Sequence, residues 1–296
     1  MNNAAISVSN HSMRASQRQK SVSGIFLILF VSRLTAQAPA FDVASIKPTI
    51  ATTDSVIQAR ANGRLDATNA SLRSLILKAY AIHESQLIGA PGWIATEKFD
   101  VDARVEPTPP GGPDALLPML RTLLAERFRL RVHSEMRELP AFVLTVARRD
   151  RRLGSQIRPT EVDCTKPNQL TVDQIRAQAR DGWPPCGMTY TVQYVAQAAT
   201  GLANRMRVRR SAISMKDFAI ALQTSVDRPV VDGTGLEGRF DAEYSYATAT
   251  DIAAGIAGNQ PLLLVALEEQ LGLKMDARRT TVPALVVDSV ERLIEN

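Results

Sequence analysis

The chain has 296 residues, of which 45% are hydrophobic and 5% aromatic, an ordinary composition for a globular protein. Four of its 35 basic residues and none of its 30 acidic residues lie in the first 38 positions, so the remainder carries 31 basic against 30 acidic residues. This balance argues against nucleic-acid binding, which needs a clustered basic surface. The one basic run, Arg205–Arg210, has an alternating pattern that predicts the solvated face of a strand.

The N-terminal segment has the three parts of an export signal. Arg14, Arg18 and Lys20 give a positive region, Gly24–Ser32 is apolar, and Ala36-Gln37-Ala38 places small residues where a signal peptidase cuts. We expect cleavage after Ala38 and a periplasmic or secreted protein without a transmembrane span. A retained N-terminal anchor is the alternative, although the apolar stretch is shorter than the roughly 20 residues of a membrane span.

The first structured segments predict strands followed by a helix. Residues 41–47 alternate as a short strand that stops at Pro48. Asn62-Gly63 separates two further strands, 56–61 and 64–68, as a two-residue hairpin turn does. Ser71 is a helix N-cap ahead of apolar residues at helical spacing.

A strand and a second helix follow. Residues 99–105 form the strand, and a proline-glycine connector leads to Pro113, which suits the first turn of a helix; Pro118 could instead mark a later start. Residues 128–132 and 141–147 then predict an antiparallel pair.

The same order of elements returns 143 positions later. Ser214 takes the place of Ser71, Val282–Val286 matches Leu139–Val143, and a second helix at 262–271 ends at Gly272. A constant offset predicts an internal duplication. The expected fold is therefore α+β, with a hairpin-helix-strand-helix-hairpin module at 39–147 and again at 189–296.

Between the two modules lies an irregular insert, residues 148–188, which contains the only cysteines, Cys164 and Cys186. Two cysteines in one insert of an exported chain predict a disulfide. Within the second module, the small residues of 247–258 predict a flexible loop.

The segment Arg228–Asp241 is the most distinctive motif. Asp232 and Gly233 form a turn dipeptide, and with Gly235 and Gly238 they predict a structural turn between two strands. Alternation after Phe240 places Asp241, Glu243 and Ser245 on the exposed face of the second strand. The order Asp-Gly-Thr-Gly differs from the aspartic-protease loop, and no phosphate-binding motif follows.

Few residues qualify for catalysis. His133 and Glu135 share a strand face and are the nominees for an acid–base pair, while His83 beside Glu84 lacks a third ligand for zinc. No nucleophile motif, metal set or cofactor loop is present, so we expect no cofactor. Trp93 is a possible ligand platform, but as the counterpart of Leu236 it is better interpreted as an apolar peg.

Several motifs together resemble a large family of exported proteins from soil bacteria, whose shared region is a domain of unknown function. They are Phe41–Pro48, Ser71–Tyr80, Gly89–Trp93, Leu123–Phe128, Arg228–Asp241 and Gln270–Leu273. The resemblance implies export. Some relatives carry a similar region beside a membrane metalloprotease of the antibiotic-sensor type, which implies sensing or binding, and the family supplies no catalytic residue.

Two functions remain open. The first is a non-enzymatic binding or interaction module outside the cytoplasm, with an unknown ligand or envelope protein as its partner. The second is a hydrolase-like envelope enzyme that uses His133 and Glu135. The two differ in whether these side chains converge with a third polar group in a pocket.

Overall fold

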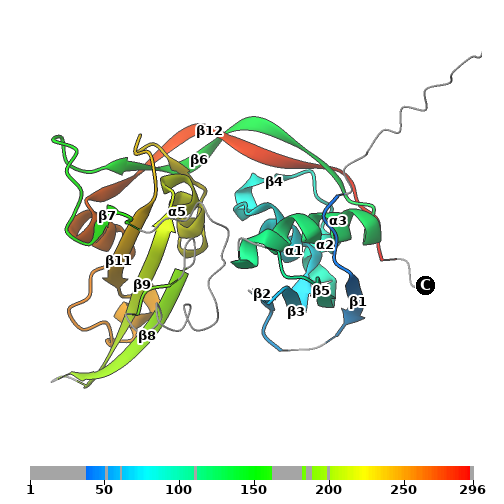
Figure 1. Ribbon diagram of the computed structural model, residues 1–296, viewed down its shortest axis with the longest axis horizontal. Coiled ribbons are helices and arrows are strands. Elements are labelled where there is room, and N and C mark those ends of the chain that lie inside the picture. The colour runs from blue at the N-terminus through cyan, green and yellow to red at the C-terminus, as the bar shows by residue number, and fades with distance from the viewer. Residues whose placement is uncertain are drawn as a thin grey trace, which may run out of the picture. The chain divides into compact units, whose positions relative to one another are not determined.

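The structure is a computed structural model of an α+β protein (Figure 1). Residues 38–296 form one compact unit. The structure describes residues 38–50, 53–60, 62–109, 112–161, 182–184, 189–198 and 201–293.

The first half contains an antiparallel sheet, here called sheet A, in the order β1-β5-β3-β2. Its strands are β1 (Val43–Thr49), β2 (Val56–Ala59), β3 (Arg64–Ser71) and β5 (Lys98–Arg104). The helices of this half are α1 (Leu72–Tyr80), α2 (Trp93–Thr96) and α3 (Leu117–Arg127), with 3-10 turns at Glu84–Gln86 and Gly112–Leu116. Side chains of sheet A and of all three helices share one core.

Local signals explain where these elements begin. The Ser71 hydroxyl accepts a hydrogen bond from the Ser74 amide at 3.0 Å and caps α1, as expected. Pro113 falls in a 3-10 turn and α3 begins at Leu117, so the later start marked by Pro118 is confirmed. Proline is tolerated there because the first amides of a helix have no intrahelical acceptor.

The second half contains another antiparallel sheet, here called sheet C, in the order β7-β11-β9-β8. Its strands are β7 (Ile157–Pro159), β8 (Thr189–Ala198), β9 (Gly201–Ile213) and β11 (Phe240–Tyr246). The helices are α5 (Met215–Leu222), capped by Ser214 as expected, α6 (Ala249–Ala253) and α7 (Leu263–Ala266); a 3-10 turn at Gln223–Ser225 follows α5 and a π turn at Leu267–Leu271 follows α7. A second core fills this half.

The expected hairpin between 128–132 and 141–147 is wrong. Residues 131–132 of the first segment and 141–146 of the second belong to one strand, β6 (Arg131–Val146), which pairs along its length with β12 (Leu273–Ser289). The intervening residues contain no glycine or asparagine for a tight turn. The predicted strand was therefore correct in type but was assigned the wrong partner.

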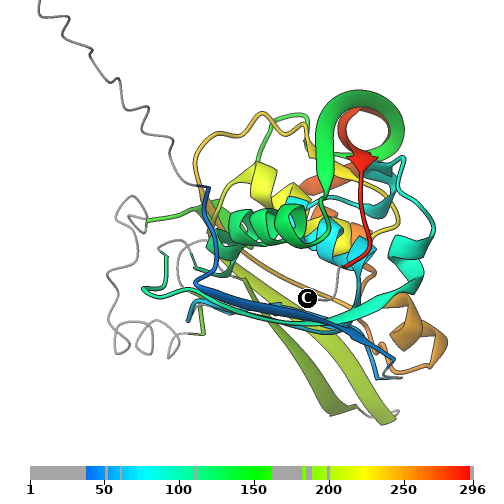
Figure 2. The same cartoon turned by 90° about the vertical axis from the view of Figure 1, so that its right-hand side faces the viewer.

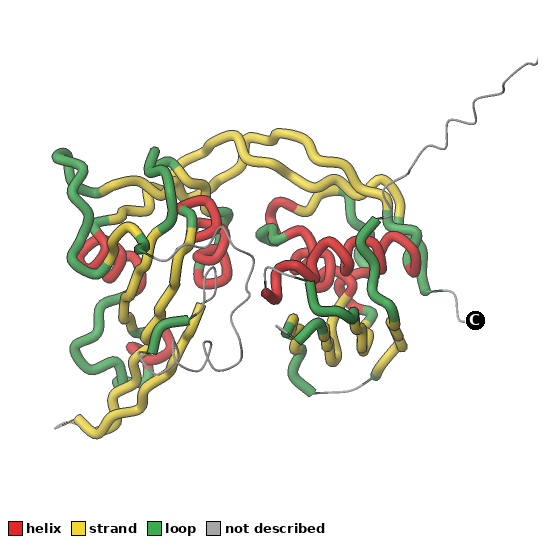
Figure 3. The backbone as a smooth tube through the Cα atoms, viewed as in Figure 1, coloured by secondary structure: helices red, strands yellow, loops and turns green. Residues whose placement is uncertain are grey.

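The paired strands β6 and β12 run from one half of the structure to the other (Figure 3) and contribute side chains to both cores. Leu285 and Val287 of β12 belong to the core of the first half, whereas Leu144 of β6 belongs to the core of the second. Two short parallel strands complete this third sheet, here called sheet B: β4 (Leu87–Ile88) on β12 and β10 (Val230–Asp232) on β6. Each half thus sends a long strand into the core of the other.

Two further expectations are corrected. Residues 247–258 are not all loop, because Thr248 and Asp251 form a capping box that starts α6, and Asp251 is buried. Asp241 of β11 is not exposed. It is buried and accepts a hydrogen bond from the Ala212 amide at 2.9 Å.

Candidate ligand-binding surface

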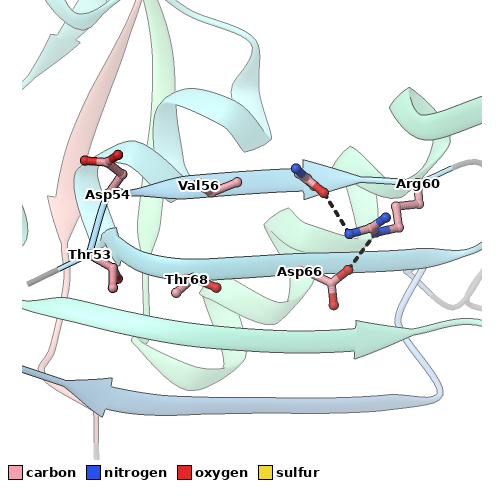
Figure 4. A pocket seen from close by; sticks show the side chains of 7 residues that line it. Thr53, Asp54, Val56, Arg60, Asp66 and Thr68 are labelled. Carbon is pink, nitrogen blue, oxygen red and sulfur yellow. Dashed lines mark hydrogen bonds and ion pairs between the residues drawn. The ribbon is translucent and has the colours of Figure 1, made fainter. Parts of the chain in front are cut away.

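The outer face of sheet A is hollowed (Figure 4). Alternation along β3 sends Leu65 and Ala67 into the core and Asp66 and Thr68 outward. The hollow has a volume of about 460 Å³ and is lined by Thr53, Asp54, Val56, Gln58, Arg60, Asp66 and Thr68. One apolar side chain among polar ones is a lining suited to a ligand held by hydrogen bonds.

Four charged side chains of this sheet form ion pairs with one another: Arg60, Arg64, Asp66 and Asp102. Asp66 accepts from the Arg60 Nε at 2.9 Å through one oxygen and from the Arg64 Nε at 2.5 Å through the other. Arg64 also contacts Asp102 across the strands at 3.3 Å. Because both oxygens of Asp66 are engaged by guanidinium groups, this carboxylate is arranged to fix the surface and not to remove a proton.

One face of sheet C carries a similar charge network, and Trp183 lies on it. Arg209 donates to Glu243 at 2.7 Å and to the carbonyl of Gly182 at 2.6 Å. The neighbouring Trp183 ring lies 5.4 Å from the Arg209 guanidinium and 6.0 Å from that of Arg158. Stacking of guanidinium groups on indole therefore holds this aromatic on the sheet.

His133 and Glu135, the residues nominated as an acid–base pair, each contact a different residue in the structure. His133 Nδ1 lies 2.8 Å from Asp288 of β12, and Glu135 accepts from Arg137 at 2.5 Å. The side chains of His133 and Asp288 are 52% and 45% exposed. The structure thus provides a histidine–carboxylate contact, but with a carboxylate that the sequence did not nominate and outside the hollow of sheet A.

Trp93 begins α2 and is half-buried against the core of the first half. The Arg292 guanidinium lies 5.2 Å from the centre of its ring and also donates to Glu97 at 2.6 Å. Leu236, its proposed counterpart, packs against the core of the second half. One side of the Trp93 ring is therefore already engaged by a cation of the same chain.

The loop after β10 is tied by its own polar groups. Asp232 accepts from the amide and the hydroxyl of Thr234, at 2.8 and 2.7 Å, and Thr234 is buried. Gly235 and Gly238 have φ of +62° and +90°. Two strands flank this turn as expected, but β10 and β11 belong to different sheets, so the loop joins sheets instead of closing a hairpin.

His83 has a local structural role. Its Nδ1 accepts from the Ser85 amide at 3.2 Å in a capping box of the 3-10 turn. Partial burial lowers the pKa of His83 most, and the charges of Glu84 and Asp227 oppose this shift.

Arg210 is a buried charge that the sequence interpretation missed. It donates to the hydroxyls of Thr189 at 2.7 Å and Tyr244 at 3.3 Å, and its guanidinium lies 5.5 Å from the Phe218 ring. Burial in turn raises the pKa of Tyr244, and the nearby Arg210 charge partly opposes this. Adjacent residues of a strand point to opposite faces, so Arg209 and Arg210 could not both have been solvated on one face.

Three further expectations concern the cysteines, metal binding and membrane spans. Cys164 and Cys186 are outside the described residues. The described ranges contain no group of three or more His, Cys, Asp or Glu residues placed to hold a metal ion. None of the helices in this part of the chain has the length and hydrophobicity that crossing a membrane requires.

Comparison with protein families finds that residues 73–290 match a model described as "Protein of unknown function (DUF3738)". The chain belongs to this family. No curated protein and no solved structure matches the chain. The family region begins within α1 and extends past the end of β12, so it includes both long strands of the ribbon but not sheet A strands β1 to β3. The family description assigns no activity, and the hollow itself must be the basis for a functional proposal.

Proposed function

We propose that the protein is a non-enzymatic binding or interaction module that acts outside the cytoplasm and consists of two related α+β halves. One observation carries the proposal: the outer face of sheet A is open and hollowed, whereas the chain covers the corresponding face of sheet C with its own Trp183. An open polar face beside a covered one is a place for a ligand or a partner.

Equivalent backbone features support the relation between the halves. Asn69 and Ala212, 143 positions apart, both have positive φ, of 50° and 49°. Their amides donate to Asp100 at 2.8 Å and to Asp241 at 2.9 Å, and each of these carboxylates follows a phenylalanine of the adjacent strand. A left-handed conformation of a residue other than glycine is uncommon, so its recurrence with the same acceptor favours duplication.

The third sheet supports the same conclusion. Leu87 of β4 pairs with Leu285, and Val230 of β10 pairs with Phe142; both members of the first pair are offset by 143 positions in the second. The ribbon pairs Glu138 with Thr281, which are again 143 apart. These registers fit two copies of one module that exchange their last strand.

The two outer faces then differ in one respect that matters for binding. Arg64 and Asp102 on sheet A correspond to Arg207 and Glu243 on sheet C, where the ion pair is also formed, at 2.6 Å. On sheet C an aromatic side chain and a backbone carbonyl of the insert lie over this network. We propose that a ligand with comparable polar and planar groups occupies the hollow of sheet A.

A substitution in the hollow tests this function. Val56→Lys places a long charged chain in the hollow, and Val43→Lys is its control, because Val43 is an exposed valine of the same sheet outside the lining. Both proteins and the wild type are used to capture species from envelope extract. We expect a species retained by the wild type and by the control but lost with Val56→Lys; equal capture by all three contradicts the hollow as the site.

Action outside the cytoplasm rests on the N-terminal pattern of the sequence. We propose cleavage after Ala38, so that the mature protein starts at Pro39. N-terminal sequencing of the protein made in a bacterial host tests this, and an intact Met1 in the cytosolic fraction would contradict it.

The alternative is a hydrolase-like envelope enzyme, favoured only by the His133–Asp288 contact, which could orient an imidazole base. We expect no turnover of generic ester, phosphoester, peptide or glycoside substrates. Turnover that disappears in His133→Ala would establish the alternative. Because exposed ion pairs contribute about 0–1 kcal/mol, the same variant should otherwise unfold at nearly the urea concentration of the wild type.

A further inference from the structure

Most edge strands among the described residues are short or protected. A sheet edge offers unpaired amide and carbonyl groups to other chains, and proteins protect it with short strands, charged residues or proline. The edge strands β2, β4, β7 and β10 have two to four residues each, and β1 carries Lys47 and Pro48. The edge strand β8 is different, with ten residues from Thr189 to Ala198.

The β8–β9 hairpin also extends beyond its sheet (Figures 1 and 2). The pairing of β11 with β9 ends at Met206, whereas β8 and β9 stay paired to Ala198 and Gly201. The distal part of the hairpin therefore has only two strands in the described structure. A two-stranded ribbon is marginally stable in water by itself.

This hairpin lacks the usual protection of an edge. No charged residue and no proline occurs from Thr189 to Asn204. In the first half of β8 the side chains of Thr191, Val192 and Gln193 are exposed, and Val192 is 44% accessible. Length, exposure and absence of charge are the combination that natural edges avoid unless they pair.

We propose that β8 pairs antiparallel with β8 of a second copy of this chain, which joins the two C sheets across a two-fold axis. The absence of charge favours a second copy over a different protein. At a two-fold axis every residue near the axis meets its own kind, so a charge would repel itself. A strand from a different partner carries no such restriction, and charge complementarity normally gives such interfaces their specificity.

The pairing completes the hydrogen bonding of the edge. The outward amide and carbonyl groups of β8 acquire partners along the whole strand, and the two-stranded part of the hairpin becomes four-stranded. This dimer is independent of the proposed ligand site, because the hollow lies on sheet A and the pairing edge on sheet C.

Matched valines on the two edges test the dimer. Val192→Lys charges the β8 edge, and Val56→Lys makes the same change on β2, where the valine is 43% exposed. Sedimentation equilibrium of the protein expressed from the full sequence should show a dimer for the wild type and for Val56→Lys. The dissociation constant of Val192→Lys should rise at least tenfold. Val56→Lys remains the variant that abolishes capture at the hollow, so the two proposals can fail separately.

A charge swap at Gln193 tests the two-fold geometry, because this residue lies near the middle of β8. Gln193→Lys and Gln193→Glu should each be monomeric, and their equimolar mixture should dimerise at low salt. Circular dichroism would reveal a folding defect in Val192→Lys, and the Gln193 variants would then test the pairing at a second position. A monomeric wild type at all concentrations, or a dimer that survives both substitutions, overturns the proposal; so does a wild-type monomer that pairs only with a foreign strand.

Discussion

Two glycines of the loop after β10 should be required for different reasons. Gly235 has φ of +62°, and a Cβ there would lie 3.6 Å from Arg151, an ordinary contact. Gly233 has no positive φ, but its Cβ would lie 2.5 Å from Val143 Cγ1 and 3.3 Å from the Leu144 carbonyl. The first position is therefore limited by backbone conformation, and the second by packing.

The magnitudes follow from these two causes. Gly235→Ala should cost about 1 kcal/mol, the usual penalty for a left-handed residue with a Cβ. Gly233→Ala should cost about 1–3 kcal/mol, as overpacking does in a filled core. Val143 is only 3% exposed, and the Gly233 amide donates to the Leu144 carbonyl at 2.9 Å. Neither neighbour can therefore move away from a new Cβ without losing core packing or this hydrogen bond.

A double-mutant cycle separates the two causes. Val143→Ala removes the Cγ1 atom with which the new Cβ of Gly233→Ala would clash. The double mutant should therefore be less destabilised than the sum of the two single changes by about 0.5–3 kcal/mol. Val143→Ala and Gly235→Ala should be additive. Urea melts followed by circular dichroism give the free energies of unfolding. A Gly235→Ala midpoint equal to that of the wild type, or the same coupling for both glycines, would refute this reasoning.

Three further outcomes are expected. Because the pKa of His83 is lowered in the folded protein, the unfolded chain takes up a proton first; the free energy of unfolding should fall as the pH drops below about 6.5, and His83→Asn should flatten this dependence in pH-dependent urea melts. Asp241→Ala should cost about 1.5–3 kcal/mol by freeing a buried amide, and Asp100→Ala less, because Asp100 is only half-buried; the same melts measure both. We also propose a Cys164–Cys186 disulfide, which would stabilise the folded protein by roughly 3 kcal/mol by closing a loop in the unfolded chain. Intact-mass measurement after alkylation should show two thiols only after reduction. Two thiols in the untreated protein would contradict the disulfide.

Sequence predicted the elements best where a local hydrogen bond or a local backbone conformation determines them. The caps Ser71 and Ser214 each accept from an amide three residues ahead, and Gly63 and Gly272 both have the positive φ that a turn and a helix end require. These interactions lie within a few residues of one another. Their pattern is therefore visible in a single chain.

Pairing over long distances was not predictable in the same way. Alternation identifies a strand but not its partner, so β6 was assigned to a hairpin although it pairs with β12 more than 120 residues away. The partner of His133 is Asp288, 155 positions later, for the same reason. Asp241 was expected to be exposed, but β9 has an extra residue between the partners of Phe240 and Ala242, and the Ala212 amide of this bulge donates to the carboxylate.

The exchange of strands explains why apolar residues say so little about function in this chain. β12 contributes Leu285 and Val287 to the first core, and β6 contributes Leu144 to the second, so each core is completed by a strand that begins outside it. Apolar positions in both long strands are thus constrained twice, by pairing and by packing. The outer faces of sheets A and C are free of that constraint, and it is there that the two halves differ: one is covered by Trp183 and the other is hollow. If the two halves are copies of one module, as we propose, a difference between them on surfaces that folding leaves unconstrained is where binding specificity can arise.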